Sequence, residues 1–571
     1  MTRPTITSER IDDVPLLISW LLQMQVGEIV DSILGPPHGN RQGLSYGQLA
    51  VVFIAYILTQ CNHFLGPVRD WVLARRECLA QALGRPIRDT DCTDDRLADL
   101  LDAVGPAEVR EQIEMHLGQH LIRAYALPTD TGRIDTTSVS VYHQPDGESL
   151  LSFGHSKDHR SELRQFKEVL GTLDPAGVPL CSATVGGQCA DDPLYLPTWR
   201  RMAAAIGHTA FLAVGDCKMA CLDTRAQIHQ AGGYYLTPLP LTGDVPDDLR
   251  RWVLAPPVPP VDIYLPQAAD DPPVGQGFEV SVVRTWTDPQ TGAGVGWEER
   301  VLVMRSDKLA YRQQHGLTQR LLRAEQALRK IKPGPDADLG GLTVQGQTIL
   351  ERYNVRDYLR VTWTPHAIQT KHYLKRGRHG PDSPFEIATT TRWQLTVERQ
   401  PEAIAMFHRL AGWRLYVTNT AAGRLDLSSA VACYREQWQP ERGFHRLKGV
   451  PLAVRPLFLR SDRRIRGLLC LLVSALRALT LLEFVARRSL EQQPEPLQGL
   501  YAGNPKRATP RPTAERLLQA FDGLTLYRSS DSKTTWYEVT PLSALQRRIL
   551  ALVGFSESVY TSLGQPLLAG P

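Results

Sequence analysis

Three carboxylates are the residues of this sequence whose types and positions best suit chemistry, and two of them follow or lie on predicted strands. Asp135 lies in Arg133–Tyr142, where apolar and polar residues alternate, and Asp216 directly follows the apolar run Ala210–Gly215. In an open α/β sheet, ligands gather at the carboxyl ends of the strands. Two carboxylates there could share Mg²⁺, a hard cation that prefers oxygen ligands. Taken singly, an aspartate at such a position is more often a turn or helix-capping residue.

The third carboxylate, Glu441, stands seven residues after Tyr434 and seven before Lys448. Seven residues advance a helix by almost two turns, so one continuous helix would place all three side chains on one face. An ordinary amphipathic helix with charge pairs gives a similar pattern. Pro440 leaves two possibilities, because a proline here predicts either a kink in the helix or the first turn of a second helix. In the second case Tyr434 would not lie on the same face as Glu441.

Short apolar runs predict the elements that would position the two aspartates. The predicted strands are Arg133–Tyr142, Phe166–Leu173, Val178–Val185, Ala210–Gly215 and Tyr234–Pro238, and the predicted helices among them are Leu194–Ile206 and Leu222–Ala231. The residues Asp174-Pro175-Ala176-Gly177 predict a hairpin turn between the second and third strands. The order of the elements predicts a mixed α/β sheet.

The flanking segments have different patterns, and together they predict five parts of the chain. Residues 1–127 show helical spacing, residues 128–240 and 409–490 carry the mixed sheet and the Glu441 helix, residues 241–408 form a β-rich insertion, and residues 491–571 are a C-terminal extension. Within these parts we expect a loop at Pro256–Pro273, a helix at Leu317–Ile331, a final strand at Trp413–Thr418 and a long helical stretch at Ser428–Lys448.

Composition excludes several classes of protein. The 571 residues are 43% hydrophobic and 22% charged, which excludes a disordered chain, a collagen-like fibre and a coiled-coil rod.

The net charge of +4 does not by itself indicate a nucleic-acid partner, but the charge is unevenly spread. Residues 433–466 contain nine Lys or Arg and three acidic residues, whereas residues 85–114 contain four Arg and nine acidic residues. Basic stretches of this kind predict phosphate contacts, although short charged loops are also common as solvated hairpin tips.

The cysteines and the apolar runs indicate a reduced, cytoplasmic protein. The nine cysteines are odd in number and form no CxxC pair, so neither a disulfide framework nor a zinc site is predicted. The N-terminus shows no secretory signal. The apolar runs Leu44–Leu65 and Gly467–Ala486 contain polar or charged residues, and we expect both to form buried helices rather than membrane spans.

The order and separation of these motifs resemble the DDE transposases of bacterial insertion sequences. The group in question has a β-rich domain inserted before the last Glu and a helix with the pattern Tyr-x2-Arg-x3-Glu-x6-Lys. The resemblance spans roughly residues 10–490 and rests on Gly154–Arg160, Val214–Asp216, Trp438–Lys448 and Arg455–Phe458. The stretch of chain between Asp216 and Glu441 is much longer than the one between Asp135 and Asp216, which leaves room for the insertion.

The resemblance implies an RNase H-like fold and a catalytic triad of Asp135, Asp216 and Glu441, which would hold two Mg²⁺ ions, with Mn²⁺ as a possible substitute. It implies that the protein cuts the element's terminal inverted repeats and joins them to target DNA, as a homodimer bound to the nucleoid and not to a membrane. The helical N-terminal part would recognise the DNA ends or mediate dimerisation. With the basic stretches, the implied DNA-binding residues are Tyr434, Arg435, Arg442, Lys448, Lys157, Arg160, Lys371, Lys375, Arg376 and Arg378.

One departure from the family pattern is Gln437, which stands where the pattern has Arg, so that Arg435 and Arg442 become candidates to replace it. Two alternatives stay open. One is a catalytically inactive or domesticated DNA-binding protein, and the other is a nuclease of the same fold that does not transfer strands. Cleavage of end DNA in Mg²⁺ separates the first alternative from a transposase, and strand-transfer products separate the second.

Overall fold

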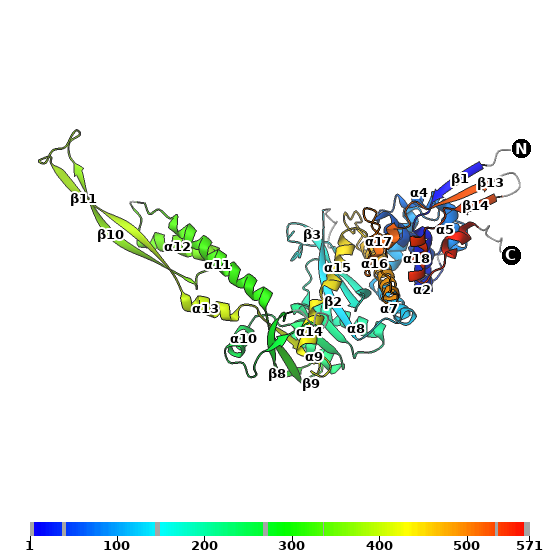
Figure 1. The fold of residues 1–571 in the computed structure, drawn as a ribbon, viewed down its shortest axis with the longest axis horizontal. Coiled ribbons are helices and arrows are strands. Elements are labelled where there is room, and N and C mark those ends of the chain that lie inside the picture. Colours follow the sequence, from blue (N-terminus) through cyan, green and yellow to red (C-terminus); the bar gives the residue numbers. More distant parts are fainter. Residues whose placement is uncertain are drawn as a thin grey trace. The chain divides into compact units, whose positions relative to one another are not determined.

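The computed structural model describes residues 5–36, 42–142, 149–265, 272–334, 336–530 and 535–564. Figure 1 shows the succession of helices and strands along the chain. The contacts divide the chain into two compact units. The first comprises residues 1–237, 284–297 and 433–571, and the second comprises residues 238–283 and 298–432. The finer division into five parts remains a prediction.

A mixed sheet forms one half of the first unit. Its strands are β2 (Thr131–Val141), β3 (Arg164–Leu173), β4 (Val178–Gly186), β5 (Leu212–Gly215) and β6 (Tyr234–Pro238), in the spatial order β4-β3-β2-β5-β6. The pairs β4-β3 and β3-β2 are antiparallel, whereas β5 lies parallel to both β2 and β6. Helices α8 (Tyr195–Ile206) and α9 (Leu222–Gln230) connect the later strands. The prediction of a mixed α/β sheet is therefore confirmed.

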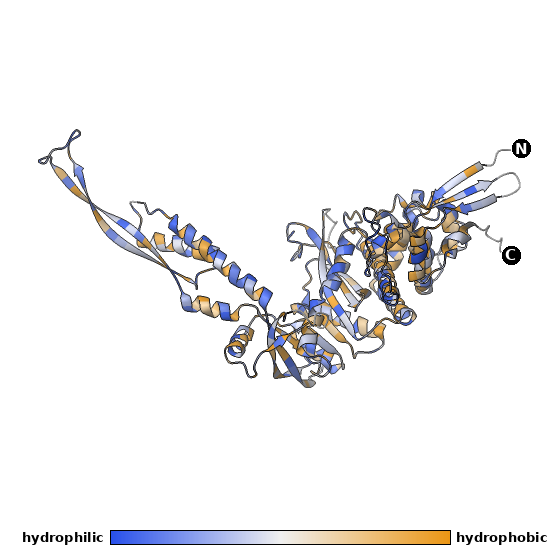
Figure 2. Cartoon of the chain, in the orientation of Figure 1, coloured by the Kyte–Doolittle hydropathy of each residue, from blue (hydrophilic) through white to orange (hydrophobic). Residues whose placement is uncertain are grey.

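Helices form the other half of the first unit, and they come from both ends of the chain. They are α1 (Val14–Gln23), α2 (Val26–Leu34), α3 (Tyr46–Gln60), α4 (Val68–Leu73), α5 (Arg76–Leu83), α6 (Asp94–Val104), α7 (Ala107–Tyr125), α15 (Trp438–Lys448), α16 (Asp462–Glu491), α17 (Ala514–Gln519), α18 (Ala544–Leu552) and α19 (Ser558–Thr561). Their apolar residues, orange in Figure 2, share one hydrophobic core. The Trp20 indole of α1 donates a hydrogen bond of 3.1 Å to the carbonyl of Ala478 in α16.

Helix α16 is long and apolar enough to cross a membrane, and α1 with α2 passes the same test as a bent pair. However, 94% of the apolar window of α16 is buried inside the protein, as we expected for Gly467–Ala486. Arg477 in the middle of this helix is fully buried, and its guanidinium donates to the carbonyls of Pro179 and Leu180 on β4 at 2.7 and 3.1 Å. The buried charge of Arg477 therefore has hydrogen-bond partners on the sheet against which the helix packs.

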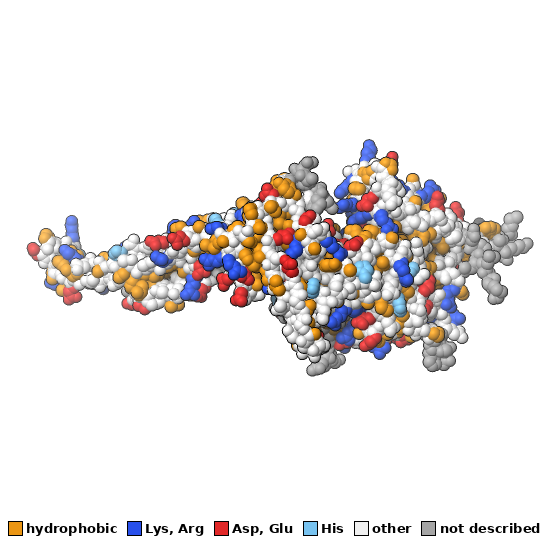
Figure 3. All heavy atoms as spheres, turned by 90° about the horizontal axis from the view of Figure 1, so that it is seen from below, with side chains coloured by type: hydrophobic (Ala, Val, Ile, Leu, Met, Phe, Trp, Pro, Cys, Tyr) orange, Lys and Arg blue, Asp and Glu red, His pale blue; other side chains and the backbone are white. Residues whose placement is uncertain are grey.

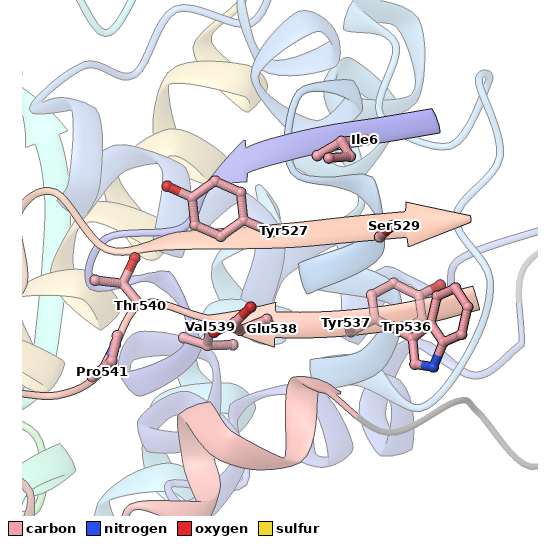
Figure 4. A pocket seen from close by; sticks show the side chains of 9 residues that line it. All are labelled: Ile6, Tyr527, Ser529, Trp536, Tyr537, Glu538, Val539, Thr540 and Pro541. Atoms are coloured by element: carbon pink, nitrogen blue, oxygen red, sulfur yellow. The ribbon is translucent and has the colours of Figure 1, made fainter. Parts of the chain in front are cut away.

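A small three-stranded sheet joins the two ends of the chain. Strand β1 (Thr5–Arg10), which was not predicted, pairs antiparallel with β13 (Thr525–Ser530), and β13 pairs with β14 (Thr535–Val539). The exposed side chains of Ile6, Tyr527 and Trp536 line a hollow of about 500 Å³ on this sheet (Figure 4).

The second unit contains strands, helices and one long hairpin. Its elements are α10 (Val245–Leu254), β7 (Val261–Ile263), β8 (Gly275–Thr287), β9 (Gly294–Ser306), α11 (Asp307–Arg329), α12 (Leu339–Arg352), β10 (Leu359–Tyr373), β11 (Phe385–Arg399), α13 (Pro401–Leu410), β12 (Trp413–Thr418) and α14 (Leu427–Arg435), the ends of β8, β9 and α14 belonging to the first unit. The predicted loop Pro256–Pro273 contains β7, and its residues 266–271 lie outside the described part of the chain. Strands β10 and β11 pair without interruption from Leu359 with Arg399 to Tyr373 with Phe385.

Candidate active site

The strand register places Asp135 and Asp216 next to each other. Strands β2 and β5 are parallel, and their last pair is Ile134 with Gly215. Asp135 is the next residue of β2 after this pair, and Asp216 is the first residue after the end of β5. The backbone N–H of Thr136 donates to Asp135 Oδ1 at 2.7 Å, and the backbone N–H of Lys218 donates to Asp216 Oδ1 at 2.9 Å. The second contact caps the short 3-10 helix Cys217–Ala220, which begins where β5 ends.

Glu441 lies in the first turn of α15, because this helix begins at Trp438. The predicted helical stretch Ser428–Lys448 is divided into two helices: α14 ends at Arg435, and the chain turns before α15 starts at Trp438. Proline is tolerated in a first turn, since the N–H groups there have no partner within the helix. Pro440 accordingly marks the start of a second helix, which is one of the two readings that the sequence left open.

A single cavity of about 720 Å³ brings the three carboxylates together. It is lined by Asp135, Thr136, Thr137, Lys157, Asp158, Asp216, Tyr434, Gln437, Glu441, Phe444, His445, Lys448, Gly449 and Arg455. Tyr434 lines this cavity with Glu441 and Lys448, although the start of a new helix was expected to move it off their face. The three side chains share the cavity although Tyr434 stands on α14 and the other two stand on α15.

Burial and like charge perturb Asp135. Burial, with smaller contributions from Asp216 and Glu441, raises the pKa of the Asp135 carboxyl to about 6, although the Lys157 ammonium and the Thr136 N–H favour its charged form. Lys157 Nζ lies 3.9 Å from Asp135 Oδ1 and donates to the carbonyl of Thr136 at 2.7 Å. It also lies 3.4 Å from Asp191 Oδ2. One ammonium group thus offsets part of the negative charge at the sheet edge.

The donor set fits a hard divalent cation. The three carboxylates offer only oxygen atoms, which Mg²⁺ and Mn²⁺ favour over nitrogen or sulfur. The mutual repulsion that contributes to the raised pKa of Asp135 is what a cation between the carboxylates would relieve. Within the described ranges, no three His, Cys, Asp or Glu side chains are already gathered closely enough to form a metal cluster. The carboxylates therefore share a cavity without forming a closed cage.

Only some of the predicted DNA-binding residues lie at this cavity. Of the residues described, Tyr434, Lys157 and Lys448 line it, whereas Arg435, Arg442 and Arg160 do not. The Arg442 guanidinium instead donates to both carboxylate oxygens of Glu483 on α16, at 2.5 and 2.7 Å. One residue beyond Glu441 is about 100° further round the helix, which turns Arg442 towards the neighbouring helix. Arg160 pairs with Glu162.

The remaining predicted basic residues belong to the second unit. Lys371 lies in β10, with its ammonium 4.3 Å from the centre of the Phe385 ring. Lys375, Arg376 and Arg378 lie in the exposed turn between β10 and β11, so the predicted hairpin tip is present.

Several groups at the site were not among the predicted site residues. Asp158 accepts a hydrogen bond of 2.8 Å from Lys448 Nζ and lies 3.8 Å from a guanidinium nitrogen of Arg455. Tyr195 donates to Asp216 at 2.5 Å. Asp158 and Arg455 stand in motifs that carry the family resemblance, Gly154–Arg160 and Arg455–Phe458, so the resemblance could have pointed to them. No motif, spacing or periodicity indicates Tyr195.

Gln437, which replaces an Arg of the family pattern, lies beside a buried arginine from another element. Arg133 of β2 donates to Gln437 Oε1 at 3.4 Å and makes two hydrogen bonds of 2.7 Å with Asp174. A guanidinium is therefore present near this position, although it comes from the sheet rather than from the helix.

Comparisons with known proteins point to one family. No curated protein matches the sequence. Among solved structures, the chain is similar to the piggyBac transposase in a synaptic complex with hairpin DNA, with 8% identity, 81% of each chain covered and a TM-score of 0.25. That TM-score is too low to support any conclusion about this chain. A family model, described as the transposase DDE domain, matches residues 128–477, which is more than half of the chain and includes all three carboxylates. The chain therefore belongs to the transposase DDE domain family.

Proposed function

We propose that this protein is a transposase of the bacterial insertion-sequence type, which cuts the ends of its element and joins them to target DNA on an RNase H-like fold. The observation that carries the proposal is the cavity shared by Asp135, Asp216 and Glu441. These residues stand far apart in the sequence: Asp135 lies on β2, Asp216 directly follows β5, and Glu441 lies on α15. The family match supports the same reading.

The three carboxylates would hold two Mg²⁺ ions. Bound there, the ions supply a more acidic water or 3′-hydroxyl and neutralise charge on the leaving oxygen. Asp135 and Asp216 would offer their oxygens from the sheet edge, and Glu441 would offer its oxygens from the first turn of α15. The raised pKa of Asp135 means that cation binding competes with a proton at this residue.

The cations around the cavity would hold the DNA backbone. Lys448, Lys157 and Arg455 line the same cavity as the carboxylates, so a phosphate placed against them lies within reach of the acidic group. Charged Lys and Arg contacts to phosphate fix the register of DNA but carry little sequence information. The Tyr434 side chain completes this wall of the cavity.

The proposed reaction consists of two phosphoryl transfers. In the first, a water oxygen forms a bond to the phosphorus at the element end, the bond from phosphorus to the 3′-oxygen breaks, and a free 3′-hydroxyl results. In the second, that 3′-oxygen bonds to a target phosphorus and displaces the target's own 3′-oxygen. Charge increases on the transferring phosphoryl group in both steps, and Lys448 and Arg455, which line the cavity, would stabilise it.

The assembly and location follow as part of the same proposal. A transposase that joins two ends at once needs two active sites, so we propose a homodimer in the DNA complex. We also propose that it acts in the bacterial cytoplasm, on the nucleoid.

The test uses a labelled duplex that carries the inverted repeat flanking the gene, incubated with the full-length protein and Mg²⁺. We expect Asp216→Ala to abolish cleavage and to leave binding of the duplex largely intact. The control is Asp223→Ala, which removes a carboxylate of α9 whose partner is Gln227. Cleavage by Asp216→Ala at the wild-type rate would contradict the proposal.

A second candidate is a DNA-binding protein without activity, and Gln437 is the observation that favours it. Pro440 does not favour it, because a proline in the first turn removes no hydrogen bond of the helix. The same duplex decides between them, since cleavage excludes the inactive protein. Joined products with a supercoiled target then distinguish a transposase from a nuclease that only cuts.

A further inference from the structure

Tyr195 is a buried tyrosine whose hydroxyl reaches one of the candidate metal ligands. It is the first residue of α8, its side chain is fully buried, and its hydroxyl donates a hydrogen bond of 2.5 Å to Asp216 Oδ1. A hydrogen bond from a neutral donor to a carboxylate is stronger than one between two neutral groups. The contact joins the start of α8 to the end of β5, the strand that follows it along the chain.

The end of β5 is shaped to admit the tyrosine ring. A Cβ atom on Gly215 would come within 3.0 Å of Tyr195 Cε1 and within 2.7 Å of Met219 Sδ. Because Gly215 has no side chain, the ring can lie against the strand immediately before Asp216. The glycine thus removes the atom that would push Tyr195 away from the carboxylate.

Asp216 is held from three sides by the described residues. Oδ1 accepts from the Tyr195 hydroxyl and from the Lys218 N–H, and the backbone carbonyl of Asp216 accepts from Thr237 Oγ1 at 2.7 Å. Both donors to the carboxylate reach the same oxygen. Since Asp216 also lines the cavity, the arrangement leaves Oδ2 as the oxygen to face it.

We propose that Tyr195 is a positioning residue for divalent cation binding, which holds Asp216 Oδ1 so that Oδ2 is presented to the cavity. The inference rests on the proposed function, because it takes Asp216 as a metal ligand. Partners that orient a metal ligand commonly change metal affinity about 10–100-fold when they are removed. Tyr195 itself touches neither the cation nor the DNA.

The test measures Mn²⁺ binding to the full-length protein by titration calorimetry, without DNA. Tyr195→Phe keeps the buried ring and removes only the hydroxyl, so we expect it to fold and to raise the Mn²⁺ dissociation constant about tenfold. The matched control is Tyr560→Phe. Tyr560 is equally buried in the same unit, and its hydroxyl donates to the backbone carbonyl of Asp12 at 2.9 Å. We expect this control to change the dissociation constant less than twofold.

A double-mutant cycle shows whether the effect passes through Asp216. In the Asp216→Asn background, we expect Tyr195→Phe to change the Mn²⁺ dissociation constant less than twofold, whereas in the Asp135→Asn background it should keep its tenfold effect. Equal effects in all backgrounds, or an effect of Tyr560→Phe as large as that of Tyr195→Phe, would overturn the inference.

The same data separate this inference from the proposed function. If Asp216→Asn weakens Mn²⁺ binding and Tyr195→Phe does not, the role of Tyr195 is wrong and the metal site stands. If Asp216→Asn leaves Mn²⁺ binding unchanged, the metal site itself is wrong, and the inference about Tyr195 falls with it.

Discussion

At the scale of single residues, Asp158 places a negative charge beside two cations that the proposed function assigns to DNA. Its carboxylate accepts from Lys448 at 2.8 Å and lies 3.8 Å from Arg455. A DNA phosphate must compete with this carboxylate for the same donors. We expect Asp158→Asn to bind the inverted-repeat duplex about fivefold more tightly at low salt, which corresponds to about 1 kcal/mol, measured by fluorescence anisotropy.

The control for this prediction is Asp192→Asn, which removes an exposed carboxylate 3.6 Å from Lys218. Exposed ion pairs of this kind contribute little to the free energy of folding. We expect no change in DNA affinity from the control, and an Asp158→Asn protein that binds DNA no better than wild type would contradict the competition.

Asp13, at the start of α1, is a buried carboxyl whose protonation links stability to pH. Burial raises its pKa to about 7, although the Thr59 hydroxyl donates to it at 3.1 Å. The folded protein keeps a proton that the unfolded chain releases near pH 4, so this residue lowers stability progressively as pH rises from about 4 to about 7. We expect Asp13→Asn to remove this decline and to stabilise the protein by about 2 kcal/mol at pH 8.

Urea unfolding of both proteins at pH 5 and pH 8 checks this prediction. The asparagine Oδ1 can still accept from Thr59, so the comparison isolates the charge. If the free energy of unfolding changed equally with pH in the two proteins, Asp13 would not be the group that lowers stability as pH rises.

The predictable residues of the site are those that stand on regular elements. Asp135 and Asp216 could be placed together because parallel strands end at one edge of a sheet, and the register confirms their adjacency. Their catalytic roles remain predictions. The contact of Tyr195 with Asp216 could not be found in this way, because it depends on how α8 packs against the end of β5. The contact of Asp158 with Lys448 could not be found because it joins two segments far apart in the sequence.

At the scale of elements, an ion network fastens the helix that carries Glu441. Glu483 of α16 accepts hydrogen bonds from Arg442 and Arg446 of α15 and forms an ion pair of 2.7 Å with Arg487, one turn further along α16. Arg446 is almost fully buried and also donates to Glu515 of α17 at 2.7 Å. Three helices are therefore joined directly behind the cavity-facing side of α15.

We expect Glu483→Gln to lower the free energy of unfolding at pH 7 by about 3 kcal/mol, because it leaves a buried guanidinium poorly compensated. Burial alone would raise the pKa of Glu483, but the three arginines outweigh it and the pKa is lowered. The stabilisation is therefore present above about pH 4.5 and is lost as pH falls through the folded-state pKa.

The control for Glu483→Gln is Glu557→Gln, which removes an exposed pair of 3.1 Å with Arg547. Urea unfolding should show a loss of about 0.5 kcal/mol or less for this variant. Similar small losses for both variants would mean that the network does not hold α15.

The elements that the sequence did not predict have physical explanations. Helix α2 follows α1 after only Met24 and Gln25, and Gln25 has a left-handed φ of 57°, so apolar spacing alone does not reveal the break. Strand β1 is stabilised by β13, which comes from the opposite end of the chain. Helix α12 has two glycines, which are poor helix formers, directly after its first residue Leu339, and the Asp338 side chain caps it.

At the scale of the whole molecule, the first unit is assembled from distant segments. Trp20 bonds to α16, Tyr560 bonds to Asp12, and β1 pairs with β13, so the first and last parts of the described chain share one core. The mixed α/β class was predictable from the order of elements. The core shared by the two ends of the chain was not predictable, because local sequence patterns carry no information on which distant apolar faces meet.

The net charge of +4 is the sum of basic and acidic stretches of the chain. The basic tip of the β10–β11 hairpin in the second unit allows a direct test of whether such a stretch binds DNA. Figure 3 shows basic and acidic side chains together at its far end. If the tip contacts phosphate, replacing Lys375, Arg376 and Arg378 with alanine should reduce the slope of log affinity against log salt by about 2–3, without changing thermal stability. The matched control replaces the exposed Arg329, Lys330 and Lys332 at the end of α11. Equal slope changes in both variants would indicate a general loss of charge, whereas a change confined to the tip would place DNA against this hairpin.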